Sequence, residues 1–166
     1  MQSIRLLLLA LLDVLLPNGK IGDRWRGLIA THLFKSCGDN LKFKKNVYFA
    51  TPKKVTLGKN VWFSNNVTLG AGEICIGDDV MFGPSVCVHA ENHTRLNGAY
   101  RFGIPSGEPV VIGNGTWIGA NATICAGARI GSGCIVAAGS VVLRGEYPCD
   151  SLLAGVPAVF KKKLSD

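Results

Sequence analysis

Large apolar residues recur at every sixth position over most of the chain. With short slips and one long break, these hexads begin at Phe43, Phe49, Leu57, Phe63, Leu69, Ile76, Phe82, Val88, Ile112, Ile118, Ile124, Ile130, Val136 and Val142. The fifth place of most hexads holds a small or β-branched residue. Neither an α-helix nor an alternating β-strand has a period of six, so the pattern indicates a repeat architecture.

Three hexads close one triangular coil of about 18 residues, and stacked coils form three flat parallel sheets around columns of apolar side chains. Gly and Asn, which are frequent in the hexads, adopt the positive φ angles that tight corners need. The sequence therefore predicts an all-β fold, a parallel β-helix over residues 41–145. A helical segment over residues 1–40 precedes it, and a short C-terminal helix or tail over residues 146–166 follows.

The first 40 residues lack the hexads and show two helical patterns. Residues 4–16 are nearly all apolar, but at about 1.5 Å per residue they are too short to cross the roughly 30 Å core of a bilayer. Residues 23–36 suggest an amphipathic helix. Its predicted apolar face holds Trp25, Leu28, Ile29 and Leu33, with Arg24, Arg26 and Lys35 outside that face. We expect residues 4–35 either to lie on an anionic membrane or to pack on the protein body or a neighbouring subunit.

Composition limits the classes of partner. The chain has 166 residues, 48% of them hydrophobic and 17% charged, which is typical of a folded domain. A net charge of +7 favours a polyanionic partner, but no nucleic-acid-binding motif is visible, so a phosphate-rich cofactor or a membrane is expected instead. The six cysteines include no CxxC pair and indicate a reducing, cytoplasmic location, with the inner face of the cell membrane as an alternative.

The long break in the hexads, residues 91–110, is the candidate functional insertion. It contains His93, whose imidazole can remove a proton from a hydroxyl near neutral pH. His89 is the competing general base. With His32, these are the only three histidines, and they are too dispersed to predict a metal site.

Two segments extend this pattern to a family resemblance: WIGANATICAGARIGSGCIVAAGSVV and LLAGVPAVFKKKL. With the hexads, they resemble the hexapeptide-repeat acetyltransferases, in particular the galactoside, maltose and capsular-polysaccharide O-acetyltransferases. The resemblance implies a left-handed β-helix, acetyl-coenzyme A as co-substrate, no metal and a homotrimer with its sites between subunits. It also implies roles for individual residues. His93 is the general base, Trp117 lines the acceptor slot, the Ala120 N–H binds the oxyanion, and the coenzyme is bound by Gly119, Ala120, Ala138, Gly139, Ser140, Arg144, Lys161 and Lys162.

The acceptor side departs from the sugar acetyltransferases, because the asparagine and aspartate that grip the sugar in those enzymes align near Ser64 and Gly72. We expect O-acetylation of a small-molecule or lipid-linked saccharide in capsule, exopolysaccharide or lipopolysaccharide biosynthesis, with Arg95 and Arg101 binding the acceptor. Three alternatives stay open: N-acetylation of an amino sugar nucleotide, a metal-dependent hydratase of the same fold, and a non-catalytic scaffold. Glu91 and Asp78 are candidates for orienting His93.

Overall fold

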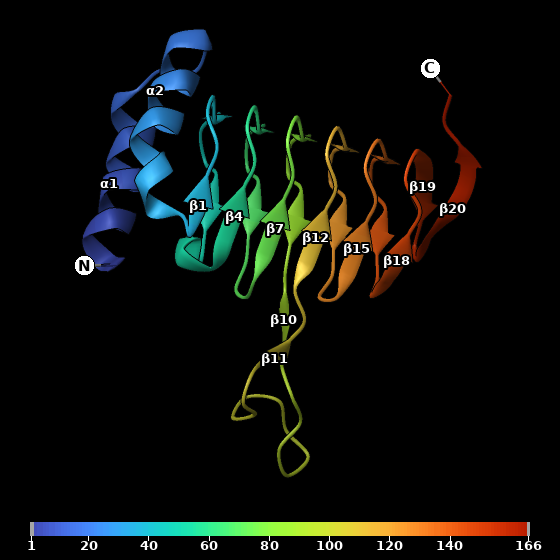
Figure 1. Ribbon diagram of the computed structural model, residues 1–166. Coiled ribbons are helices and arrows are strands. Elements are labelled where there is room, and N and C mark those ends of the chain that lie inside the picture. Colours follow the sequence, from blue (N-terminus) through green and yellow to red (C-terminus); the bar gives the residue numbers. More distant parts are fainter. Residues whose placement is uncertain (1, 166) are drawn as a thin grey trace.

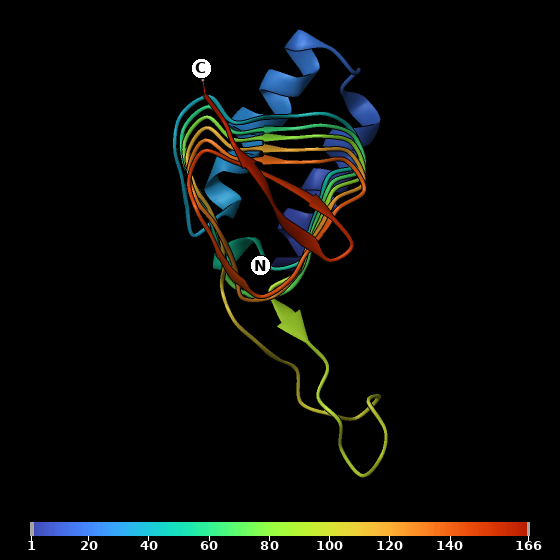
Figure 2. The ribbon, with the colours of Figure 1, turned by 90° about the vertical axis from the view of Figure 1, so that its right-hand side faces the viewer.

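The computed structural model describes residues 2–165 and confirms the left-handed parallel β-helix (Figure 1). Three parallel sheets form the faces of a triangular prism (Figure 2). Face A consists of β1 (Ser36–Cys37), β4 (Val55–Leu57), β7 (Ile74–Ile76), β12 (Val110–Ile112), β15 (Ala128–Ile130) and β18 (Gly145–Tyr147). Face B consists of β2 (Lys42–Phe43), β5 (Trp62–Phe63), β8 (Met81–Phe82), β13 (Trp117–Ile118), β16 (Ile135–Val136), β19 (Ser151–Gly155) and β20 (Ala158–Lys163). Face C consists of β3 (Tyr48–Phe49), β6 (Thr68–Leu69), β9 (Cys87–Val88), β14 (Thr123–Ile124) and β17 (Val141–Val142).

The core contains the residues that begin the hexads, together with small fifth-place residues such as Val61 and Val80. All fourteen residues that begin a hexad are buried, and partners in register on neighbouring coils stack in columns, such as Phe63 on Phe82 and Ile118 on Val136. The rings of Phe63 and Phe82 stack with centroids 4.7 Å apart, and Phe49 meets Phe63 edge to face at 5.8 Å. Burying such columns is the main source of stability in a stacked repeat.

The corners of the prism are made by the fourth place of the hexads, which takes a left-handed backbone conformation. The residues with positive φ at this place include Asn46, Asn60, Asn66, Asp79, Ser85, Gly115, Asn121, Gly133 and Gly139. Asn and Gly pay the smallest steric cost there, which explains their frequency in the repeat. The three corners form long edges, named here A/B, B/C and C/A after the faces they join.

Two helices, α1 (Gln2–Leu15) and α2 (Lys20–Ala30), lie at the N-terminal end of the prism, and the 3₁₀ turn η1 (Thr31–Leu33) leads into β1 (Figure 1). The predicted apolar face of the second helix is right for Leu33, which is buried, but wrong for two of its four residues. Trp25 and Leu28 are exposed, whereas α2 packs through Gly22, Asp23, Arg26, Gly27 and Ala30. Small residues form this contact because the backbones of α2 and the first coil approach closely. No helix within the described residues is long and apolar enough to cross a membrane.

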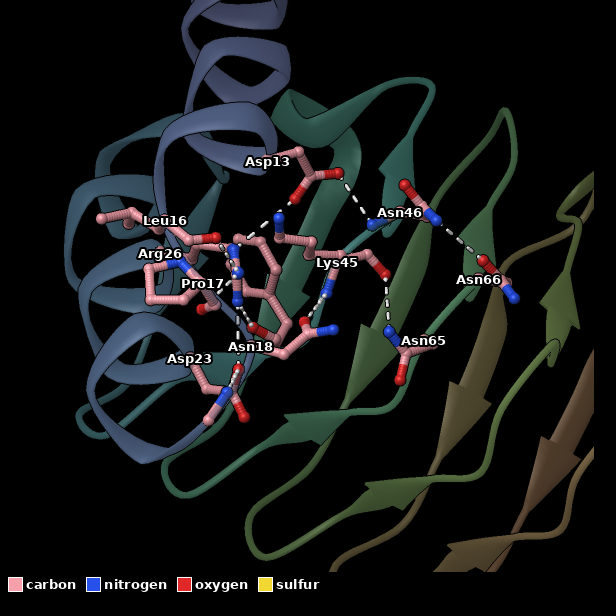
Figure 3. A network of polar contacts seen from close by, with 12 residues as sticks. Asp13, Leu16, Pro17, Asn18, Asp23, Arg26, Lys45, Asn46, Asn65 and Asn66 are labelled. Atoms are coloured by element: carbon pink, nitrogen blue, oxygen red, sulfur yellow. Dashed lines mark hydrogen bonds and ion pairs between the residues drawn. The ribbon is translucent and has the colours of Figure 1, made fainter.

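Arg26, expected on the polar side of its helix, is fully buried and ties both helices to the prism (Figure 3). Its Nη1 donates to Asp23 Oδ1 at 3.0 Å and to the Phe43 carbonyl at 3.1 Å. Its Nη2 donates to the carbonyls of Leu16 and Pro17 at 2.8 and 2.9 Å. Its Nε lies 3.6 Å from Asp13 Oδ1, within ion-pair range but beyond a hydrogen bond. The guanidinium therefore links the turn between α1 and α2 to the first coil of the prism.

Substitution of Gly27 by Ala should loosen this docking. A Cβ at Gly27 would overlap the Leu41 carbonyl oxygen, and neither backbone can move without disturbing the first coil. We expect a loss of about 1–3 kcal/mol in the free energy of unfolding, measured by urea denaturation. At Gly115, a Cβ would meet nothing within 4 Å. Any loss of stability in Gly115→Ala would therefore come from its positive φ and not from crowding.

Two segments interrupt or end the coils. The antiparallel pair β10 (Glu91–Asn92) and β11 (Ser106–Gly107) forms the base of a long arm, and the 3₁₀ turn η2 (Pro52–Lys54) lies two coils earlier on the same C/A edge. The C-terminal segment, predicted to be a short helix or a tail, contains no helix among the described residues, since β19 and β20 form an antiparallel hairpin that ends face B. The strand-forming residues on either side of the Gly155–Pro157 turn explain this outcome.

Candidate active site

His93 lies on the insertion arm (residues 91–109), which leaves the prism at the C/A edge between β9 and β12. The arm begins as a two-residue ladder in which Glu91 faces Gly107 and Asn92 faces Ser106. His93 is the first residue beyond this ladder, and its side chain is exposed. The ladder therefore fixes the backbone beside His93 while leaving the imidazole open to a reactant.

The rest of the arm extends away from the prism (Figure 2). It is braced internally by a hydrogen bond of 2.6 Å from Thr94 Oγ1 to the Ile104 carbonyl and by a tight turn that joins Leu96 to Ala99. Phe102 and Ile104 are 75% and 81% exposed. An arm that presents large apolar side chains to solvent and does not fold back on its own prism is shaped to contact another surface.

Trp117 and Ala120 lie elsewhere on the prism. Trp117 is 46% exposed and stands on the outside of face B, in register between Met81 and Ile135. Ala120 lies on the B/C edge, where its N–H donates to no acceptor among the described residues. The missing side chain of Gly83 keeps this amide open, because a Cβ there would lie 2.7 Å from the Ala120 nitrogen. The sequence thus builds an unpaired backbone donor on the edge opposite the arm across face C.

The small residues predicted to bind the coenzyme continue along the same B/C edge, one coil further. Ala138 and Gly139 are exposed, and the Gly139 N–H donates to the Ala120 carbonyl at 2.8 Å. Ser140 differs from the expectation, since it is buried and its Oγ accepts the Gly155 N–H at 3.2 Å. Its hydroxyl binds the C-terminal hairpin, so Ala138 and Gly139 remain accessible to a ligand but the Ser140 side chain does not.

The predicted basic residues are divided between two places. Arg144 lies on the C/A edge, where its Nη1 pairs with Glu108 Oε1 at 3.1 Å. Both line a hollow of about 470 Å³ with Asn92, at the base of the arm. Lys161 and Lys162 are exposed on β20 at the end of face B, and Lys161 is the extra residue of a β-bulge. Glu108 belongs to no recognisable motif, so the sequence did not predict that it would pair with Arg144.

Three of the other candidates contact different parts of the prism, and two lie exposed on the arm. His89 lies on the C/A edge with its ring over Gly70, where a Cβ would overlap the imidazole. Glu91 pairs with Lys54 at 3.2 Å. Asp78 accepts the Lys59 N–H at 2.9 Å on the A/B edge, the one edge that carries neither the arm nor Ala120, so it is not placed to orient His93. Arg95 and Arg101 are exposed on the arm, with the Arg101 guanidinium 5.5 Å from the Phe102 ring centroid.

Comparison with known proteins agrees with this architecture. Residues 109–144 match the family described as bacterial transferase hexapeptide (six repeats). A maltose O-acetyltransferase from Clostridium difficile 630 superposes on 99% of this chain and 87% of its own, with a TM-score of 0.87 and 27% identity. Residues 109–144 therefore carry the hexapeptide repeat of this family, and the whole chain is similar in fold to hexapeptide-repeat acetyltransferases.

Two more relatives bear on the chemistry of hexapeptide-repeat proteins. A hexapeptide-repeat acetyltransferase from Vibrio cholerae O1 biovar eltor, complexed with acetyl coenzyme A, covers 99% of this chain and 89% of its own at 26% identity, with a TM-score of 0.80. The galactoside O-acetyltransferase of Escherichia coli (strain K12) is 28% identical over 97 residues, 58% of this chain. That alignment spans 48% of the galactoside enzyme, so the chain matches about half the length of this curated relative.

Four of the six thiols of the protein are poor nucleophiles. Burial raises the pKa of Cys87, Cys125 and Cys134, and raises that of Cys37 to about 11. Thiols with a raised pKa remain protonated at neutral pH, whereas nucleophilic cysteines have a depressed pKa. These four thiols are therefore poor candidates for forming a covalent enzyme intermediate. Within residues 2–165, no cluster of three or more His, Cys, Asp or Glu side chains is arranged to hold a metal ion.

One prism does not bring the candidate residues together. His93 lies on the C/A edge, Ala120 and Ala138 on the B/C edge, and Trp117 on face B. Face C separates the two edges. A reactant that touches both His93 and the Ala120 N–H must therefore lie between two copies of the chain, or the arm must bend back over its own face.

Proposed function

We propose that the protein transfers the acetyl group of acetyl-coenzyme A to a hydroxyl of a saccharide. Two features of the same prism support it most strongly. His93 is exposed on the C/A edge, and the Ala120 N–H is an unpaired backbone donor on the B/C edge. The similarity to a maltose O-acetyltransferase over 99% of the chain, and to an acetyltransferase complexed with acetyl coenzyme A, points the same way.

In this proposal, His93 accepts the proton of the acceptor hydroxyl as its oxygen attacks the thioester carbonyl carbon. The new C–O bond converts the carbonyl oxygen into an oxyanion, which the Ala120 N–H stabilises by a charge-assisted hydrogen bond. The C–S bond then breaks, the carbonyl re-forms as an ester, and the imidazolium returns its proton to the departing sulfur. Atoms and charge balance with no further reactant.

The active unit is proposed to be a homotrimer. A ring of three prisms with face C turned toward the axis sets the C/A edge of each copy beside the B/C edge of the next. The arm of one copy then reaches face B of its neighbour, where Trp117 and Met81 are exposed and match Phe102 and Ile104 of the arm in character. The cleft between them would hold the acceptor, with Arg95 and Arg101 beside it.

The coenzyme is proposed to run along the B/C edge from Ala120 past Ala138 and Gly139 toward the C-terminal hairpin. Small residues let the narrow pantetheine arm approach the backbone. Lys161 and Lys162 provide positive charge for the 3′-phosphate where the coil ends, and Arg144 adds a further cation on the C/A edge of the neighbouring copy.

The double variant Lys161→Gln with Lys162→Gln should raise the KM for acetyl-coenzyme A by about tenfold and leave kcat nearly unchanged. The 3′-dephospho form of the coenzyme supplies the matched control, because the variant and the original protein should use it equally well. An equal loss with both forms of the coenzyme would place these lysines elsewhere. Arg129→Gln, an exposed cation on face A, should change neither KM.

The function itself is tested by incubating the purified full chain with acetyl-coenzyme A and a panel of saccharides, and following thiol release. The panel contains free sugars, lipid-linked oligosaccharides of bacterial surface polysaccharides, and nucleotide-linked amino sugars. Acetyl esters on a saccharide support the proposal. Acetyl amides on an amino sugar would replace O-acetylation by N-acetylation, and failure to bind acetyl-coenzyme A by calorimetry would overturn both.

A further inference from the structure

An apolar surface with a basic rim, outside the proposed active site, lies where α2 crosses the first coils of face B. We propose that this surface docks on a lipid bilayer that contains anionic lipids. The apolar part, called the cap surface here, consists of Ile21, Trp25 and Leu28 of α2 and Trp62 of β5. These four line a hollow of about 740 Å³.

The cap surface is apolar because α2 docks on the prism with the opposite side. Gly27 and Arg26 are turned to the first coil, and Gly22 is turned to the Pro17 carbonyl between the two helices. The large side chains one position away are therefore left outside. Ile21 is 75% exposed, Leu28 58% and Trp25 51%. The Arg26 network fixes the helix in this orientation, so the exposure is a consequence of specific buried contacts (Figure 3).

The helix α1 presents a second exposed apolar face. Ile4, Leu7, Leu11 and Val14 follow one another at intervals of three and four residues, which places them on one face of the helix. All four are at least half exposed. Since α1 is too short to cross a bilayer, an apolar face of this kind suits a helix that lies in the membrane interface.

The rim of the cap surface is basic. Lys20, Arg24 and Lys42 line the same hollow, and none of them forms an ion pair with a described residue. Asp23 is the one acid that lines the hollow, and its carboxylate is bound to Arg26 at 3.0 Å. Lys44 lies next to the rim, with Nζ 5.7 Å from the Trp62 ring centroid. The rim therefore offers uncompensated positive charge to phosphate headgroups.

The chemistry favours a bilayer over a second copy of the chain. A two-fold contact between cap surfaces would oppose the same unpaired cations, in a chain whose net charge is already +7. Tryptophan beside lysine and arginine at the border of an apolar surface is typical of residues at the membrane interface, where the ring lies at headgroup level and long cations reach the phosphates.

The test is flotation of the full chain with vesicles of phosphatidylcholine alone and of phosphatidylcholine with about 30% phosphatidylglycerol, at about 0.1 M salt. We expect binding to the anionic vesicles and a marked loss without phosphatidylglycerol. Ile21→Ser with Leu28→Ser should lower the partition coefficient more than tenfold, an order-of-magnitude figure for two exposed aliphatic side chains. Lys20→Gln with Arg24→Gln should lower it by about ten- to thirtyfold.

Matched controls lie away from the cap surface. Val156→Ser with Val159→Ser on the C-terminal hairpin, and Lys59→Gln with Arg129→Gln, change the same kinds of exposed side chain and should bind vesicles as the original protein does. The proposal is overturned if the full chain does not float with anionic vesicles, or if Ile21→Ser with Leu28→Ser binds normally. It is also overturned if that variant dissociates the oligomer in light scattering, since the surface would then lie between copies. Acetylation of a water-soluble acceptor is measured separately and does not depend on this outcome.

Discussion

Replacement of His93 by Ala is expected to lower kcat for acetyl transfer by about 10²–10⁴-fold, while the chain keeps its fold and oligomeric state. The side chain is exposed on the arm and makes no contact on which the core depends, so its loss removes the general base without unfolding the protein. Steady-state kinetics with acetyl-coenzyme A and a saccharide acceptor measures the effect. Binding of the coenzyme, measured by calorimetry, should change less than about threefold.

His89→Ala is the matched variant for this prediction. His89 belongs to the same edge, is also exposed, and packs over Gly70 instead of standing beyond the β10–β11 ladder. We expect its kcat to stay within about tenfold of that of the original protein. If His89→Ala caused the larger loss, or if His93→Ala retained more than about a tenth of the activity, the base would have been assigned to the wrong histidine.

Replacement of Arg26 by Ala is expected to destabilise the protein by about 3–5 kcal/mol, the largest loss we expect from a single substitution in α1 or α2. The guanidinium is fully buried, and its removal leaves the Asp23 carboxylate and the carbonyls of Leu16, Pro17 and Phe43 without their donor. Urea denaturation at fixed protein concentration measures the change. The melting temperature should fall by about 6–20 °C.

Arg24→Ala provides the control for this second prediction. Arg24 is the neighbouring arginine on α2 and is exposed, so its truncation should alter the free energy of unfolding by no more than about 0.5 kcal/mol. Arg26→Lys retains the charge but not the fork of donors, and should recover only part of the loss. A cost below about 1 kcal/mol for Arg26→Ala would mean that the network does not hold the helices to the prism.

The prism was predictable from sequence because a period of six leaves little freedom. Every residue that begins a hexad is buried, and counting hexads in threes places His93 and Ala120 on different edges. The packing of α2 was not predictable in the same way. Large apolar residues dominate a helical wheel, whereas the contact is made by glycines at close backbone approach and by an arginine with enough buried carbonyls around it.

The C-terminal hairpin and the candidate site show two further limits. Strand residues on both sides of the Gly155–Pro157 turn were visible in the sequence, but their pairing depends on the free edge that β16 offers at the end of face B. The distance between His93 and the Ala120 N–H of another copy is a property of the assembly. The sequence of a single chain does not encode that distance in any visible pattern. The arm and the unpaired amide do have local causes, which are the β10–β11 ladder and Gly83.

The most direct test of the acetyl-transfer proposal is a crystal structure of the protein with acetyl-coenzyme A. It should show the thioester oxygen about 2.7–3.2 Å from the Ala120 nitrogen of one copy, with the His93 imidazole of the adjacent copy facing the acetyl carbon across a gap wide enough for one hydroxyl. Coenzyme bound away from the B/C edge, or every His93 more than about 10 Å from the thioester with the arm ordered, would contradict it.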